Sequence, residues 1–209
     1  TAVLGFILIF LTRTRGAVIG IFIGLLVLLI CGIFSANKKI KKAAVVLFFA
    51  LLALGIIFGF TYKNQFWQNI PGFDRISESV SYANDASIQT RLIAWKASME
   101  AFKEKPIFGW GLEDYLTAYS KHYDPKYAVF GETWLDRAHN KFIDILVMQG
   151  LFGITAYLAM LGAIFLAFYK RPLILAVLSA YIALYLFVFE AFNSYILFYA
   201  LLGFALVSS

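Results

Sequence analysis

Long apolar runs separated by short polar connections are the dominant pattern along the chain. The runs cover residues 1–11, 17–34, 43–60, about 146–169, 173–189 and 191–207. Most of them approach the roughly 20 residues that a helix needs to cross the hydrocarbon core of a bilayer. They do not alternate strictly, which favours helices over the strands of a membrane barrel. The pattern therefore predicts an all-α, polytopic helical membrane protein in contact with membrane lipids.

The composition agrees with this interpretation. Hydrophobic residues make up 62% of the chain and charged residues 14%, whereas a soluble domain is about half apolar and about a quarter charged. The first apolar run, residues 1–11, is too short for a complete span. We therefore expect the chain to begin inside a helix and to be the C-terminal part of a longer protein.

The charges of the connections predict the orientation in the membrane. Residues 35–42 hold four lysines and no acidic residue, and residues 170–171 are both basic. Short basic connections stay on the cytoplasmic side, which assigns residues 12–16 and 61–145 to the outer side. The net charge of +6 follows this bias and does not indicate a nucleic-acid partner.

The chain thus divides into transmembrane helices over residues 1–60, an outer segment over residues 61–145 and three transmembrane helices over residues 146–209. The outer segment holds eleven of the twelve acidic residues and both histidines. Connections of this length inside a compact bundle are usually functional. We therefore expect the chemistry of the protein to lie in this segment.

An amphipathic helix is predicted over residues 87–105 of the outer segment. Large apolar residues recur there at spacings of three and four, which places them on one helix face: Ile88, Leu92, Trp95, Met99 and Phe102. Ser87 is a candidate cap and Pro106 a terminator. Such a helix can lie flat on the membrane or cover the outer mouth of the bundle.

A tight turn and a series of tyrosines follow this helix. Gly109 and Gly111 flank Trp110, but a preceding strand and the third glycine of a dinucleotide fingerprint are missing. Four tyrosines recur at spacings of four, at positions 115, 119, 123 and 127. The pattern favours an interfacial belt, with stacking against a sugar as the alternative.

Three places in the predicted outer regions carry candidate chemistry. Arg13 and Arg15, in "TRTRG", lie on the side where the charge bias disfavours them. They either reach lipid headgroups or form an anion site, because a guanidinium binds phosphate oxygens at two points. Arg91 lies one helical turn before Trp95 and is either a solvated charge or part of a site.

The third place is "DRAHN", residues 136–140. The unperturbed pKa of histidine, about 6.5, suits His139 for proton transfer, and Asp136 or Asn140 could orient its ring. The alternative is a structural role, in which Asp136 caps the next helix and His139 lies at the interface. The spacing of the acidic residues and histidines gives no metal-binding pattern.

Taken in order, these segments resemble the O-antigen ligase and Wzy-type polymerase superfamily of bacterial envelope enzymes. The most specific pieces are "TRLIAWKASMEAFKEKPIFGWGLEDY" and "DRAHNKFIDILVMQGLFGI". The resemblance implies a GT-C-like helical membrane fold with a largely helical periplasmic region over its outer mouth. It also implies a bacterial inner-membrane location, with the active site facing the periplasm.

The same resemblance implies transfer or polymerisation of a glycan from undecaprenyl pyrophosphate onto a glycan, lipid or protein acceptor, without a metal or cofactor. Arg15, Arg91 and His139 match motif positions of the superfamily, Arg137 matches more weakly, and Arg13 adjoins Arg15. Our hypothesis is that the arginines bind the pyrophosphate. His139 would act as the base in an inverting reaction. The alternative is a transporter or flippase of lipid-linked or small anionic substrates, although the runs 17–34, 43–60 and 146–169 carry no charge.

Overall fold

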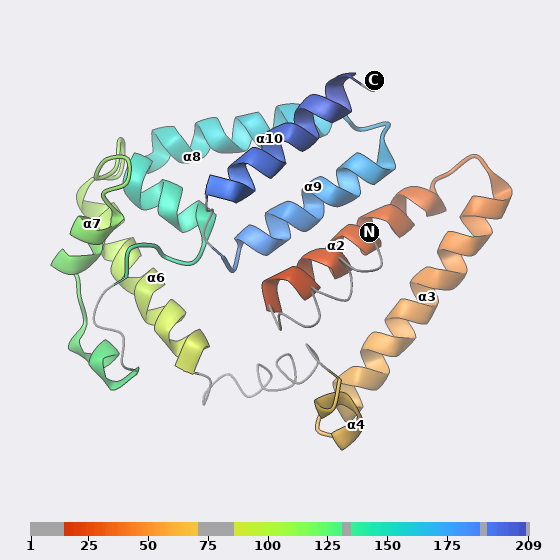
Figure 1. Cartoon of the computed structure of the whole chain (residues 1–209), viewed down its shortest axis with the longest axis horizontal. Coiled ribbons are helices and arrows are strands. Elements are labelled where there is room, and N and C mark those ends of the chain that lie inside the picture. Colours follow the sequence, from red (N-terminus) through yellow and green to blue (C-terminus); the bar gives the residue numbers. More distant parts are fainter. Residues whose placement is uncertain (1–14, 71–85, 131–134, 189–191, 208–209) are drawn as a thin grey trace. The chain divides into compact units, whose positions relative to one another are not determined.

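The computed structural model describes residues 15–70, 86–130, 135–188 and 192–207 (Figure 1). These residues form helices and connections, with no strand among them, so the predicted all-α fold is confirmed. They belong to two compact units, Thr1–Gln89 with Ala167–Leu184 and Thr90–Leu166 with Tyr185–Ser209. Among the described residues, three helices are long and apolar enough to cross a membrane, judged by length and composition alone: α2 (Arg15–Ile33), α3 (Lys38–Thr61) and α8 (Lys141–Ala167).

The first unit contains α2, α3, a short helix α4 (Gln65–Gln68) and most of α9 (Pro172–Tyr185). α2 closely matches its predicted apolar run. α3 begins five residues before its run, because the Asn37 side chain accepts hydrogen bonds from the main-chain N–H groups of Lys39 at 2.9 Å and Ile40 at 3.4 Å. Because of this cap, α3 includes the four lysines between positions 38 and 42 at its N-terminal end.

Small residues let α2 and α9 approach each other closely. A Cβ atom at Gly20 would lie 2.8 Å from the carbonyl oxygen of Ala180, and one at Gly24 would lie 2.8 Å from that of Ala176. Both pairs are spaced by four residues, which is the small-xxx-small pattern of membrane helix contacts. Main-chain contact therefore replaces side-chain interdigitation along this face.

The second unit contains most of α6 (Ala86–Glu104), α7 (Tyr115–Lys121), a 3-10 helix η2 (Pro125–Phe130), all of α8 but its last residue, and α10 (Phe192–Val207). α6 confirms the predicted helix, but its most buried face is not the predicted one. Ala94, Ala97 and Ala101 lie in the core, while Leu92 is 45% exposed. Small residues occupy the most buried positions of α6 because they allow neighbouring helices to approach closely. The larger apolar residues lie on either side of this face.

The predicted interfacial tyrosine belt is wrong for its first two members. Tyr115 and Tyr119 are 0% and 2% exposed and pack in the core of the second unit, with parallel rings 6.2 Å apart. The Tyr115 hydroxyl and the Ser98 hydroxyl are 2.8 Å apart and share a hydrogen bond. Burial raises the pKa of Tyr115 well above its ordinary value, so this hydroxyl stays protonated.

α8 is broken at Gly150, which has φ 66° and ψ −161°. The rings of Phe142 and Tyr157 are 5.7 Å apart, whereas 15 residues of straight helix would separate them by about 22 Å. The helix therefore folds back on itself, as Figure 1 shows. We call residues 141–149 the first arm of α8 and residues 151–167 its second arm.

This break corrects the predicted continuous span over residues 146–169. The second arm alone, at 1.5 Å per residue, is about 26 Å long and approaches the thickness of the hydrocarbon core, about 30 Å. The apolar pattern concealed the break because both arms are apolar. The predicted boundary at residue 145 also falls inside the first arm, which begins at Lys141.

Candidate active site

Residues 106–111 enter the break in α8 and complete its hydrogen bonds. In an unbroken helix the N–H groups of Leu151 and Phe152 would donate to residues 147 and 148. Here Leu151 donates to the carbonyl of Pro106 at 2.8 Å, and Phe152 donates to the carbonyl of Ile107 at 3.0 Å. The connection after α6 thus supplies the acceptors that the break removes.

The same connection supplies the missing donors. The N–H of Trp110 donates to the carbonyl of Val147 at 3.0 Å, and the N–H of Gly111 donates to that of Met148 at 2.9 Å. All four main-chain groups separated by the break are therefore paired, as burial in an apolar setting requires. The indole N–H of Trp110 also donates to the carbonyl of Ala101 at 2.8 Å, which ties the connection to α6.

Two glycines make this interlock possible. Gly109 has φ 72°, and a Cβ atom there would lie 2.4 Å from the carbonyl carbon of Met148. Gly150 has φ 66°, and its Cβ atom would lie 2.4 Å from the carbonyl carbon of Ile107. The tight turn predicted around Trp110 is thus confirmed, and its partner in α8 is a feature that the sequence analysis missed.

The turn before α8 places His139. The side chain of Asn140 caps α8, with its Oδ1 accepting from the N–H groups of Phe142 at 3.0 Å and Ile143 at 3.2 Å. The helix cap is therefore Asn140, and the alternative with Asp136 as the cap is wrong. His139 has φ 53°, a left-handed conformation that is uncommon for residues other than glycine.

Both main-chain groups of Ala138, the residue before His139, are held by side chains. Its N–H donates to the Asp144 carboxylate at 2.7 Å, and its carbonyl accepts from the indole of Trp95 at 2.9 Å. Asp144 is 2% exposed, so its charge is shielded from water. The main chain leading into His139 is thus fixed from α6 on one side and from α8 on the other.

Arg137 lies beside this turn and forms an ion pair with Glu113. Burial lowers the pKa of Arg137, but the hydrogen bond and charge of Glu113 outweigh this effect and raise the pKa above its ordinary value. The guanidinium is also 3.7 Å from the sulfur of Met148. Its charge is therefore partly compensated within the protein, and Arg137 braces the turn against α8.

The other predicted site residues lie in different parts of the chain. Arg91 is half-buried on α6, one turn before Trp95, and belongs to the same unit as His139. Arg15 is the first residue of α2 in the other unit. Its side chain, and Arg13 as a whole, lie outside the described residues, so the convergence of these arginines with His139 stays a prediction.

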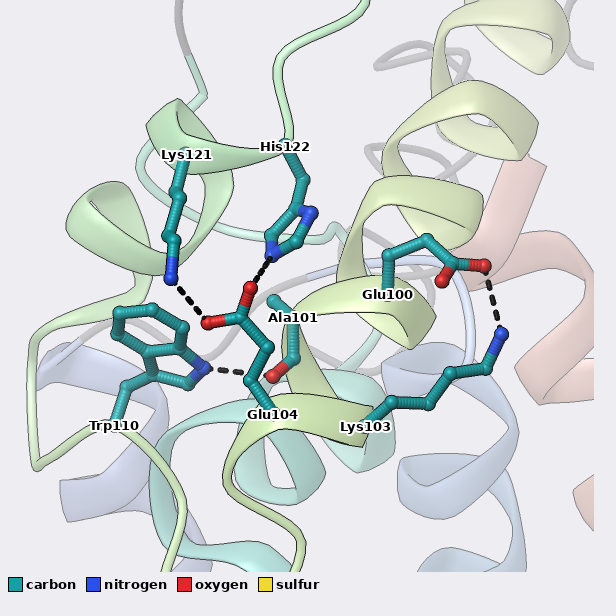
Figure 2. Close-up of polar contacts among 7 residues, drawn as sticks. All are labelled: Glu100, Ala101, Lys103, Glu104, Trp110, Lys121 and His122. Atoms are coloured by element: carbon teal, nitrogen blue, oxygen red, sulfur yellow. Dashed lines mark hydrogen bonds and ion pairs between the residues drawn. The ribbon is translucent and has the colours of Figure 1, made fainter.

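A second polar cluster joins the end of α6 to α7 (Figure 2). The Glu104 carboxylate accepts a hydrogen bond from Lys121 and lies 3.1 Å from Nε2 of His122. The ammonium of Lys121 lies 5.4 Å from the ring centre of Trp110. The hydrogen bond from Lys121 lowers the pKa of Glu104. His122 thus joins α7 to the end of α6 through Glu104.

Within the described ranges, no three His, Cys, Asp or Glu side chains gather as metal ligands. The turn at His139 offers instead a main chain that is held by the side chains of Trp95 and Asp144, and Arg91 lies half-buried in the same unit. An imidazole can accept a proton and a guanidinium can bind an anion.

The apolar helices and this site define a helical membrane protein with a polar site between α6 and α8. Its sequence matches the O-antigen ligase family over residues 1–158. The chain belongs to this family and is therefore a membrane enzyme that handles glycans. No curated protein and no solved structure matches it.

Proposed function

We propose that the protein transfers or polymerises a glycan from an undecaprenyl-pyrophosphate carrier onto a glycan, lipid or protein acceptor. The reaction takes place at the periplasmic face of the bacterial inner membrane. The observation that carries the proposal is the clamped turn at His139, because a base must be held at a fixed position to act on a bound hydroxyl. Membership of the O-antigen ligase family supports the class of reaction.

In this reaction His139 accepts the proton of the attacking hydroxyl. The hydroxyl oxygen forms a bond to the anomeric carbon of the donor sugar, while the bond from that carbon to the carrier phosphate breaks. Attack from the face opposite the leaving group inverts the anomeric centre. General-base catalysis of this kind contributes about 100- to 10,000-fold, and it requires no metal.

The leaving pyrophosphate carries away the electron pair and is a stable anion. It therefore needs compensating positive charge more than it needs a proton. We assign this role to Arg91 and Arg15, with Arg13 beside Arg15 as a further contact. Arg137, which is paired with Glu113, contributes at longer range. Loss of one preorganised donor of this type costs about 100- to 1,000-fold in rate.

Transport or flipping of an anionic lipid is the second candidate function. The observation that favours it is the break at Gly150, since transporters bind substrates at interrupted helices. In this protein, however, the main-chain groups at the break are occupied by residues 106–111. Groups already paired within the chain are poor ligands for a transported substrate.

The test is reconstitution of the full chain in vesicles with a pyrophosphate-linked glycan and a panel of acceptors. We expect covalent transfer to an acceptor, and R91A should lower the rate about 100-fold or more. R171A, an arginine change in a predicted cytoplasmic connection, is the matched control and should retain the rate. Movement of the intact donor across the membrane without transfer would overturn the proposal in favour of a flippase.

A further inference from the structure

The connection after α6 exposes apolar side chains where it enters the break in α8. Ile107 and Phe108 are 60% and 72% exposed, and Phe152 and Leu151, at the start of the second arm, are 68% and 49% exposed. The rings of Phe108 and Phe152 are 6.0 Å apart. We call these four residues the apolar tip. Single exposed apolar residues are ordinary, but a contiguous group marks a surface that contacts something other than water.

Main-chain hydrogen bonds build the apolar tip from two segments of the second unit. The carbonyl of Pro106 accepts from the N–H of Leu151 at 2.8 Å, and the carbonyl of Ile107 accepts from the N–H of Phe152 at 3.0 Å. Two apolar residues of the connection are thereby held beside two apolar residues of the second arm. Because these main-chain groups are paired within the protein, the tip can approach lipid at a lower cost.

Lipid is the occupant that the surroundings of the tip favour. Leu151 and Phe152 begin the second arm, and further exposed apolar residues, Leu158 and Leu166, recur along it. α8 is apolar and long enough to cross a membrane. The apolar tip therefore continues the lipid-facing surface of this arm, and lipid that covers the start of the arm also reaches Ile107.

A cation and an indole beside the tip indicate how deep it lies. The Nζ of Lys105 is 4.3 Å from the centre of the Trp110 ring, and these two residues flank the apolar part of the connection. Lysine and tryptophan side chains favour the level of the lipid headgroups. Glu104 is nearby, but its carboxylate accepts a hydrogen bond from Lys121 (Figure 2). The hydrocarbon core excludes irregular main chain, which also favours a shallow position.

We infer that the apolar tip inserts into the membrane at the boundary between headgroups and acyl chains, about 5–10 Å deep. Lys105 and Trp110 then lie among the headgroups. The sequence analysis offered the amphipathic helix and the tyrosines as interfacial elements, whereas this contact lies in the connection between them. It fastens the region around α6 and α7 to lipid. The inference is independent of the proposed reaction, because it concerns how this region is held and needs no substrate.

The experiment attaches an environment-sensitive fluorophore to single cysteines of the full chain in vesicles, with the native Cys31 replaced by serine. F108C reports on the apolar tip, L158C on the exposed side of the second arm, and K126C on an exposed polar position of η2. Nitroxide groups on the acyl chains of the vesicle lipid quench fluorophores that they contact. Thermal unfolding of each labelled variant verifies that it is folded.

We expect a nitroxide near the glycerol end of the acyl chain to quench F108C several-fold more than K126C. A nitroxide further along the chain should quench F108C less and L158C more, because Leu158 lies about two helical turns into the second arm. The unlabelled wild type gives a second measurement. A lipid with a photoactivatable group near its glycerol end should cross-link to residues 107–108, as mass spectrometry of the digested protein would show.

Quenching of F108C no stronger than that of K126C would overturn the inference. A fluorophore at position 108 that is shielded from water but not quenched by either lipid would also overturn it, because a second copy of the chain or another protein would then cover the tip. If F108C failed to fold, the absence of lipid cross-links to residues 107–108 in the wild type would overturn it. None of these measurements depends on glycan transfer, so the proposed function stands or fails separately.

Discussion

Gly109 and Gly150 lie against each other where the connection after α6 enters the break in α8, and a Cβ atom on Gly150 would lie 2.7 Å from the amide nitrogen of Gly109. The two residues belong to the two motif pieces that the sequence separates. In the structure these pieces form one interlocked unit. The turn that holds His139 leads into the first arm of α8, and this arm ends at the two glycines. Their packing therefore supports the candidate site.

Alanine at either glycine should therefore destabilise the protein. Each has a positive φ and no room for a Cβ atom, and strain of this kind costs on the order of 1–3 kcal/mol. A loss of 1 kcal/mol lowers the melting temperature by about 2–4 °C in a chain of this size. G162A is the matched control, because Gly162 lies in the second arm with nothing within 4 Å. Equal melting temperatures for G150A and G162A would contradict the interlock.

The anchors of Ala138 predict a specific kinetic defect. D144A removes the acceptor of the Ala138 N–H, and a buried donor without a partner costs about 1–3 kcal/mol. We expect kcat for transfer to fall more than tenfold while the KM for the acceptor changes little, because Asp144 positions the turn and is not assigned a substrate contact. D144N, which retains an acceptor oxygen, should recover part of kcat.

D136A is the control for this experiment, since Asp136 lies in the same turn but is exposed. It should leave kcat near the wild-type value. If D136A and D144A reduced kcat equally, the positioning role of Asp144 would be wrong.

The contact between α2 and α9 predicts a second pair of stability effects. Leucine at Gly20 or Gly24 would collide with the main chain of α9, so the helices would have to separate and lose packing. We expect lower melting temperatures for G20L and G24L in detergent. G55L and G59L change glycines of α3 that have nothing within 4 Å, and these controls should melt like wild type.

The Glu104 cluster predicts a pH-dependent contribution to stability. The pKa of Glu104 is lowered from 4.5, mainly by the hydrogen bond from Lys121. A lowered pKa means that the contribution is present above the unfolded-state value and is lost as the pH falls through the folded-state value. Wild type should therefore melt above E104Q at pH 7, and the difference should shrink as the pH falls below 4.5 and disappear only below the lowered pKa of the folded state. A difference that grows on acidification would contradict the assigned ion pair.

The apolar pattern predicted α2 and α3 well, because a helix in lipid must satisfy its own main-chain groups and its length is set by the bilayer. It could not reveal the break in α8. Gly150 lies within a continuous apolar stretch, and the acceptors that make the break possible come from residues 106–111. Non-local hydrogen bonds of this kind leave no periodic signal.

The site was predicted only in part. Sequence patterns identified His139 and Arg91 as candidates. The residue that caps α8, however, is Asn140 and not Asp136, and it follows directly after His139, which has a left-handed conformation. Tyr115 looked like an interfacial residue, although the hydroxyl of Ser98 gives its own hydroxyl a buried partner. Asp144 carried no signal, since one acid near a helix start is expected from the helix dipole alone.

The most direct test of the account is the rate of glycan transfer by H139A in reconstituted vesicles, with H122A as the matched histidine control. The account predicts that H139A is folded and slower by about 100- to 10,000-fold, while H122A transfers near the wild-type rate. Transfer by H139A at the wild-type rate would contradict it.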